Sequence, residues 1–559
     1  MSPMEGGTEE EDGSFFIGVP RRREGRRRQQ CKCEAFGLSE LPPQSTYVIW
    51  NEFCERFSFY GMKTLLALFF VRKLGMGETD ATEALSLFIV ACYVTPIFGA
   101  YLSDGHIGRF HTIMILSVVH LAGNALLAVF AGARGRTRLV GVAVSLALVA
   151  LGTGGIKPCV SAFGGDQIYP PEPRLIQLFF SFFYFAINAG SLLSTLVTPT
   201  VKAEAGYSFA FALPAILMAI ALLAIWKGRK TYRMVPPTGD VFTQTVRVIM
   251  SACSLRASGK AQSFSVAFKD CEKSYGRELV SDVRQLLVVL KLFLPAPIFW
   301  SLFDQQSSRW TFQASHMNCQ LGSYKMQPEQ MQSLNAFLIL ALIPLFERVI
   351  YPLASRLCGP KLALDPVYRM ASGMLLGAAS FLLAAIVQLH INNSEEGSVS
   401  VLWQIPQYVV MTSGEILFSI TGLEFAFSQA PQTMKSAVQS AWLLTDAAGN
   451  LLTVVVLEAV SKMVGQFDEF LIFSSGCLVA MVLLLFLARE FDRDIHADTE
   501  DPGALEPTNS AGRQVVELRS KPTHGQPEVK ADDGPELPND HHNEPGGSTT
   551  ISPLTGDIL

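Results

Sequence analysis

Long apolar runs dominate the pattern of hydrophobic and polar positions along the chain. Each run extends for about 20 residues, which is the length that an α-helix needs to cross the hydrocarbon core of a membrane. Twelve such runs are present, near residues 46–70, 82–103, 112–131, 138–158, 176–198, 207–226, 286–304, 330–351, 365–389, 401–423, 436–461 and 469–488. The pattern therefore predicts an all-α integral membrane protein with twelve transmembrane helices.

The composition agrees with a membrane protein and argues against an enzyme. Of the 559 residues, 49% are hydrophobic and 17% are charged, whereas about 25% of the residues in a typical soluble protein are charged. The ten cysteines show no spacing that indicates a disulfide framework or a metal site. No nucleophile–base pair or phosphate-binding loop stands out either. We therefore expect a protein that is not an enzyme and that binds no metal.

The twelve runs fall into two sets of six, separated by a long polar segment. Residues 46–226 form the first predicted bundle, 227–285 a cytoplasmic linker with amphipathic segments, and 286–488 the second bundle. A basic tail covers 1–45, and a tail rich in Pro, Asp, Glu, Gly and Ser, predicted to be disordered, covers 489–559. Six spans, a long linker and six more spans are typical of the major facilitator superfamily, whose halves rock around a central site.

The charges that flank the spans predict the orientation in the membrane. The run "RRREGRRR" before the first span favours a cytoplasmic N-terminus, and twelve spans return the C-terminus to the same side. The link "AGARGRTR" after the third span is an exception, because its arginines are predicted outside. The link between spans nine and ten is also predicted outside, where Asn392 begins a glycosylation sequon.

The first span carries charge that an apolar helix does not need. Glu52, Glu55, Arg56, Tyr60 and Lys63 fall on one side of a helix at 100° per residue. A one-sided charged stripe faces a bundle interior or a water-filled path, not lipid. The alternative is a buried ion pair that only fixes helix packing. Such pairs stabilise poorly, and each intramembrane charge costs about 2.5–3.5 kcal/mol, so a functional role is favoured.

Five stretches resemble motifs of the proton-coupled oligopeptide transporters. "EFCERFSFYG" (52–61) resembles their E-x-x-E-R-F-x-Y-Y-G motif, and "GTGGIKPCVSAFGGDQ" (152–167) and "FYFAINAGS" (183–191) resemble their two signatures. "FWSLFDQQSSRW" (299–310) and "TSGEILFSITGLEFAFSQAP" (412–431) resemble the animal intestinal and renal di- and tripeptide transporters. The matches occur in the right order and are specific as a set.

The resemblance extends from Ser45 to Phe491 and implies a function. The implied protein is a secondary-active symporter that couples proton influx to uptake of di- and tripeptides by alternating access. It implies the proton as coupling ion, no cofactor, no nucleic-acid partner and a functional monomer in the plasma membrane. Two alternatives stay open, which are an endolysosomal peptide/histidine exporter of the same family and a peptide receptor that does not transport.

The resemblance also implies roles for individual residues. A carrier for varied short peptides must hold the charged ends that all of them share. The implied ligands of the peptide carboxylate are Arg56, Lys63 and Lys157, and those of the amine are Asn188, Asn335 and Glu415. The implied residues of the side-chain pockets are Tyr60, Tyr93, Tyr184, Trp300, Tyr408 and Trp442. The implied proton-coupling groups are the carboxyl groups of Glu52, Glu55, Asp304 and Glu415.

The chain departs from its animal relatives at positions that matter for coupling and gating. Ser86 stands where those relatives have a proton-handling histidine in span two, so the carboxylates must do more of the work. Val288 and Glu347 stand where the relatives have a gating Arg and Asp. Lys291 lies three residues beyond Val288, and we expect it to reach Glu347. The alternative is that Lys291 extends toward water and Glu347 caps the end of span eight.

Overall fold

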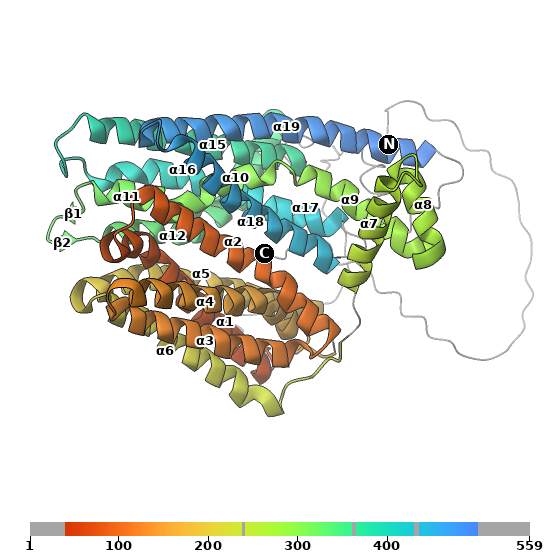
Figure 1. Ribbon diagram of the computed structural model, residues 1–559, viewed down its shortest axis with the longest axis horizontal. Helices are drawn as coiled ribbons and strands as arrows, with labels where there is room; N and C mark the ends of the chain where they lie inside the picture. Colours follow the sequence, from red (N-terminus) through yellow and green to blue (C-terminus); the bar gives the residue numbers. More distant parts are fainter. Residues whose placement is uncertain (1–39, 171, 238–240, 360–364, 430–434, 501–559) are drawn as a thin grey trace, which may run out of the picture.

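The computed structural model of the protein describes residues 40–170, 172–237, 241–359, 365–429 and 435–500. These residues form two groups of long helices that lie side by side (Figure 1). The first group, drawn in red to yellow, contains α1–α6, and the second, drawn in green to blue, contains α9–α19. Most of the predicted basic tail and the end of the predicted C-terminal tail lie outside the described residues.

The first group contains six long helices, each of which covers one predicted span. They are α1 (Pro43–Phe69), α2 (Glu78–Gly105), α3 (Arg109–Gly132), α4 (Gly135–Gly165), α5 (Pro173–Ala205) and α6 (Tyr207–Lys227). A π-helical turn, η2 (Phe70–Leu74), extends α1, and a short 3-10 turn, η3 (Gly228–Lys230), follows α6.

The second group contains spans that are broken into shorter helices. The linker contains α7 (Val241–Ala257) and α8 (Phe264–Tyr275). The helices of the second group are α9 (Arg277–Leu292), α10 (Ala296–Phe303), α11 (Arg309–Ser315), α12 (Ser333–Leu345), α13 (Tyr351–Cys358), α15 (Pro366–Asn392), α16 (Ile405–Glu415), α17 (Thr421–Gln429), α18 (Lys435–Val460) and α19 (Gln466–Glu500). Short 3-10 or π-helical turns connect them: η4 (Asp304–Ser307), η5 (Pro328–Gln332), η6 (Phe346–Ile350), η7 (Val401–Gln404) and η8 (Ile416–Ile420). Helix α9 begins at Arg277, within the segment predicted as linker.

The strands form one small antiparallel hairpin between α11 and η5. Strands β1 (Gln320–Leu321) and β2 (Tyr324–Lys325) pair with Gln320 opposite Lys325. The turn between them contains Gly322 at φ 60°, a left-handed conformation that glycine adopts without strain. We call the end of the bundle that bears this hairpin the hairpin end, and the opposite end, which bears α7 and α8, the linker end (Figure 1).

By length and composition, the described helices supply ten candidate membrane spans, or eleven with one bent pair. Ten helices are long and apolar enough to cross a membrane, and Arg277–Leu292 with Ala296–Ser315 forms one further span that bends by 52°. Helix α1 is 27 residues long and packs against α5 and α6, but its charged stripe makes it too polar for a test on composition alone. As the twelfth span, α1 therefore stays a prediction from the sequence.

Glycines let helices approach closely within each half. A Cβ atom at Gly99 on α2 would collide with the backbone of Gly155 on α4. In the second half, a Cβ atom at Gly373 on α15 would lie 2.7 Å from the carbonyl oxygen of Gly414 on α16. Small residues at such crossings are the usual means of packing membrane helices, because no hydrophobic driving force operates between helices in lipid.

The two halves contact each other along α2–α18 and α5–α12, and polar contacts join them at the hairpin end. The Lys202 Nζ on α5 lies 2.7 Å from the Glu329 Oε1 in η5, and both side chains are buried. The His316 Nε2 lies 2.9 Å from the Glu78 Oε1 at the start of α2. Two further cross-half hydrogen bonds there are Arg309–Thr79 and Gln330–Thr200. The cross-half hydrogen bonds at this end and at mid-bundle also include Lys63–Asp304 and Gln332–Thr64.

Candidate functional site

The charged stripe of α1 is a buried network within the first half. The Arg56 Nε lies 2.9 Å from the Glu52 Oε1 and 2.7 Å from the Glu55 Oε2. The Thr153 Oγ1 on α4 donates to the Glu55 Oε1 at 2.6 Å. The His120 Nδ1 on α3 lies 3.7 Å from the same oxygen, and its ring is fully buried. Both ion pairs of Arg56 are recorded at Nε, so the guanidinium lies between the two carboxyl groups.

A second buried network joins α1 to the second half. The Lys63 Nζ lies 2.9 Å from the Asp304 Oδ1, in the turn after α10. The Asn450 Nδ2 on α18 donates to the Asp304 Oδ2 at 2.7 Å and to the Asp446 Oδ1 at 3.0 Å. The two carboxyl groups therefore share one amide nitrogen. Two carboxyl groups this close in a low-dielectric interior do not both stay ionised easily, so the pair is a natural place for a proton.

Lys157, the third buried cation, lies among aromatic rings. The Lys157 Nζ on α4 lies 3.7 Å from the centre of the Tyr93 ring on α2 and 5.4 Å from that of Phe59. A ring face attracts an ammonium without neutralising it. The structure records no ion pair for Lys157 within the described residues. Its role as a ligand of the peptide carboxylate, which the resemblance implies, stays a prediction.

The predicted amine ligands are only partly brought together. The Asn335 Nδ2 on α12 donates to the Glu415 Oε2 at 2.7 Å and to the Thr412 Oγ1 at 3.1 Å. Asn188 on α5 instead donates to the carbonyl oxygen of Tyr184, one turn earlier in its own helix. Glu415 and Asn335 thus form a unit on the second half, and Asn188 lies on the other half, on a helix that packs against α12.

The predicted aromatic residues divide into three groups. Trp300 and Trp442 lie 6.0 Å apart between ring centres, and the Trp300 Nε1 donates to the Thr445 Oγ1 at 3.0 Å. Tyr60, Tyr93 and Tyr184 are each partly exposed. Tyr408 is fully buried and its ring lies 4.9 Å from that of Trp310. In this conformation Tyr408 is therefore part of the packed core and does not line a pocket.

The sequence-based prediction omitted three residues of these networks. Asp446 lies in the eleventh predicted span and His120 in the third, so the rule that intramembrane ionisable residues are functional candidates would have found both. Ser86, at the position in span two where the animal relatives have a histidine, is buried in α2. Asn450 had no such signal, because only its position one helical turn after Asp446 makes it relevant.

Three predictions at other positions stay predictions. No ion pair joins Lys291 to Glu347 among the described residues, and the Glu347 side chain is exposed, so such a gate would have to form in another conformation. Asn392 is exposed at the end of α15, and its Oδ1 accepts a hydrogen bond from the Gln388 Nε2. Across the described residues, no group of His, Cys, Asp and Glu could hold a metal ion.

Comparison with known proteins assigns the chain to a family. The family model described as PTR2, the POT family, matches residues 110–471, which is more than half of the chain. The chain belongs to the POT family. It is 31% identical to the Peptide transporter family 1 protein of Drosophila melanogaster, over 82% of this chain and 89% of that one. It is also 31% identical to Solute carrier family 15 member 2 of Oryctolagus cuniculus, over 80% and 89% of the two chains.

Solved structures of POT family members share the fold. The crystal structure of the POT family transporter PepTSo is similar with a TM-score of 0.71 at 31% identity, and covers 81% of this chain and 99% of that one. An auto-inhibited POT family peptide transporter is similar with a TM-score of 0.70 at 30% identity, over 80% and 97% of the two chains. These likenesses confirm the predicted fold class, an all-α membrane transporter of the major facilitator type. The protein is a multi-pass membrane transporter and not an enzyme.

Proposed function

We propose that this POT family protein is a secondary-active symporter that couples proton influx to uptake of di- and tripeptides by alternating access. Relatives that carry peptide transport in their names span nearly the whole membrane portion of the chain. A proton that moves down 100 mV releases about 2.3 kcal/mol, which corresponds to roughly fifty-fold accumulation of a neutral peptide. The proton is the coupling ion, and no cofactor takes part.

The observation that carries this proposal is an excess of carboxyl groups over cations in the buried networks. The described carboxyl groups are Glu52, Glu55, Asp304, Glu415 and Asp446. The described cations are Arg56, Lys63 and Lys157. With every group ionised, the site would carry a net negative charge in an environment of low dielectric constant. Protons that bind to the surplus carboxyl groups remove this charge.

The placement of charge also suits a peptide that spans the two halves. Arg56 and Lys157 on α1 and α4 offer positive charge to a carboxylate, and Glu415 on α16 offers negative charge to an ammonium. Because a peptide bound in this way contacts both halves, it stabilises their closure around it. Side chains between the two ends remain free to vary, as a carrier of many peptides requires.

The Lys63–Asp304 pair couples the proton to the conformational change. It joins the first half to the second, so the hairpin end opens fully only after the pair separates. A proton on Asp304 or a shift of charge to Asp446 removes the attraction that holds Lys63. We therefore assign the described conformation to the state that is closed at the hairpin end, with peptide exchange at the linker end.

We place the linker end in the cytoplasm and the hairpin end outside. The basic stretch at 226–233 and helices α7 and α8 lie at the linker end, as expected for cytoplasmic segments. Both termini are then cytoplasmic, and the membrane is the plasma membrane. The two halves supply every residue of the proposed site, so we expect a monomer to be sufficient, with no nucleic-acid partner.

Uptake of a labelled dipeptide into vesicles, with and without an inward proton gradient, tests this proposal. A receptor that does not transport would bind the dipeptide without accumulating it. An endolysosomal exporter would require acid on the side of the hairpin end within an organelle, which localisation of the tagged protein in intact cells distinguishes from the plasma membrane.

A further inference from the structure

We propose that a pocket at the hairpin end binds a polyvalent oxyanion. The ligand would be a phosphate or sulfate ester, or a diphosphate. The pocket has a volume of about 850 Å³, which lies within the range of small-molecule sites. Residues of both halves line it, from η2, α5 and α6 on one side and from the hairpin region on the other. It is distinct from the peptide site, whose residues lie deeper in the bundle.

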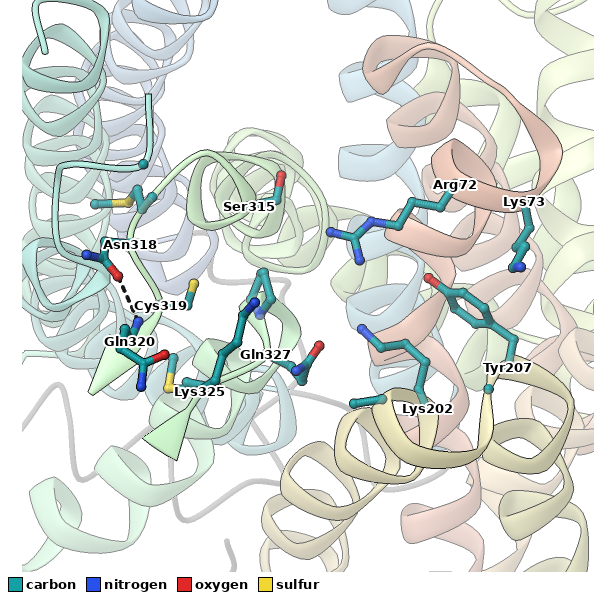
Figure 2. Close-up of a pocket in the computed structure, with 16 residues that line it drawn as sticks. Arg72, Lys73, Lys202, Tyr207, Ser315, Asn318, Cys319, Gln320, Lys325 and Gln327 are labelled. Carbon is teal, nitrogen blue, oxygen red and sulfur yellow. Dashed lines mark hydrogen bonds between the residues drawn. The ribbon is translucent and has the colours of Figure 1, made fainter. Parts of the chain in front are cut away.

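Four cations surround this pocket. Arg72, Lys73 and Lys202 line it from the first half and Lys325 from the second, and Figure 2 shows Arg72 and Lys202 extending into it. The described lining residues include no Asp or Glu. Glu329, just outside the lining, pairs with Lys202. The structure records no ion pair for the other three cations within its described residues, so the pocket keeps a positive charge that a single carboxylate would not offset.

A buried hydroxyl group points to the same ligand. Tyr207 is only 9% exposed, and its ring packs against Phe69 and Phe211. Its Oη is buried and has no hydrogen-bond partner in the described structure. An unpaired buried hydroxyl group costs free energy. In Figure 2 the hydroxyl group lies beside Arg72 and Lys202. Because its oxygen has almost no accessible surface, an anion accepts its hydrogen bond only after these flexible side chains move aside.

The chemistry of the lining favours phosphate or sulfate over a simple carboxylate. The planar guanidinium of Arg72 matches two oxygens of an oxyanion, and the lysines act as point charges around it. The amides of Asn318 and Gln327 also line the pocket, whereas the Gln320 Nε2 already donates to the carbonyl oxygen of Gly322 at 2.7 Å. A group with two or more negative charges and oxygens in several directions uses this set fully, whereas a carboxylate uses only part of it.

Binding at this place has a conformational consequence. The pocket is complete only while the two halves meet at the hairpin end, because each contributes part of its lining. An anion that binds this state better than the open one shifts the equilibrium toward closure. An anion outside the membrane is therefore expected to slow the step that opens the hairpin end.

Calorimetric titration of the purified full-length protein with inorganic pyrophosphate tests the site directly and does not depend on peptide transport. We expect one site per chain. The exposed side chains Arg72, Lys73 and Lys325 can be changed together to Gln without disturbing the core, and this variant should bind about tenfold more weakly or worse. Tyr207→Phe should weaken binding by about fivefold. Arg136→Gln, which removes an exposed cation that does not line the pocket, should bind like the unchanged protein.

Two further experiments identify the source of the anion and the effect of its binding on transport. Displacement of pyrophosphate by phosphatidic acid in vesicles, but not by phosphatidylcholine, assigns the site to a lipid headgroup, and retention of pyrophosphate assigns it to a soluble anion. External pyrophosphate should lower dipeptide uptake in the unchanged protein and not in the triple variant. Absence of pyrophosphate binding, or equal binding by the triple variant and the unchanged protein, would overturn the proposal whatever the uptake assay shows.

Discussion

Lys63 on α1 and Asp304 after α10 form an ion pair of 2.9 Å across the boundary between the two halves. Both side chains are largely buried, so the pair has little competition from water. Asn450 donates to the second oxygen of Asp304, which ties α18 into the same contact. The residues that we propose for gating and for proton transfer are therefore linked at one place in the bundle.

Removal of Lys63 tests whether this pair gates transport. Lys63→Ala leaves the Asp304 carboxylate buried without its cation, and we expect uptake to fall by about tenfold or more, since such unpaired charges cost several kcal/mol. Lys63→Arg preserves the charge and should retain a large part of the activity. Uptake is compared at equal surface amounts of each protein. Unchanged uptake by Lys63→Ala would show that the pair has no gating role.

The network around Arg56 gives a second prediction. Glu55→Gln removes the charge that contacts Arg56, and Arg56→Ala removes the proposed carboxylate ligand. Each change should abolish gradient-driven uptake while the protein still reaches the membrane. Glu395→Gln, an exposed change near the end of α15, serves as the matched control. Wild-type accumulation by either site variant would reduce the charged stripe of α1 to a packing role.

Glu415 should determine recognition of the peptide amine. Glu415→Gln keeps the size of the side chain and its partner Asn335 but removes the negative charge. Inhibition constants should rise more for dipeptides with a free amine than for analogues with a blocked amine. An equal loss for both kinds of ligand would exclude Glu415 from amine recognition.

The contact between His316 and Glu78 predicts a dependence on external pH. The hydrogen bond to Glu78 raises the pKa of His316, and the nearby Glu396 acts in the same direction. The contact is fully present below the ordinary pKa of 6.5 and is lost as the pH rises through the raised value. An acidic external solution therefore favours closure of the hairpin end. The free energy that the contact contributes is small, because both side chains are partly exposed.

His316→Gln removes this effect. With the size of the proton gradient held constant, uptake by the variant relative to the unchanged protein should rise by about two- to fivefold as the external pH falls below the pKa. His111→Gln, at the linker end, provides a control that keeps the original profile. Parallel profiles for His316→Gln and the unchanged protein would argue that the contact does not influence opening.

The sequence was sufficient for features that depend on local periodicity. The twelve apolar runs predict the spans, and spacing along one helix predicts the cluster of Glu52, Glu55 and Arg56. The partner of Lys63 was not predictable, because Asp304 is 241 positions away along the chain and only the packing of the two halves brings them together. The amphipathic start of α9 falls within the predicted linker because its charged face reduces the apolar signal.

Features that depend on conformation were also beyond the sequence. Lys291 and Glu347 were paired from helix geometry, but one conformation of an alternating-access carrier shows only the contacts of that state. The rule that ionisable residues within membrane spans are functional candidates identifies Asp446. Its importance, however, comes from the amide of Asn450, which donates to both Asp446 and Asp304. A chemical role that arises from three side chains on two helices leaves no periodic signature.

Accumulation of a labelled dipeptide in vesicles that contain the purified protein tests the central claim most directly. With an inward proton gradient and a negative interior, we expect the dipeptide to exceed its external concentration, up to roughly fifty-fold per 100 mV and proton. A proton ionophore should return the internal concentration to the external value. Equal internal concentrations with and without the gradient, from a protein that still exchanges labelled dipeptide, would contradict proton coupling.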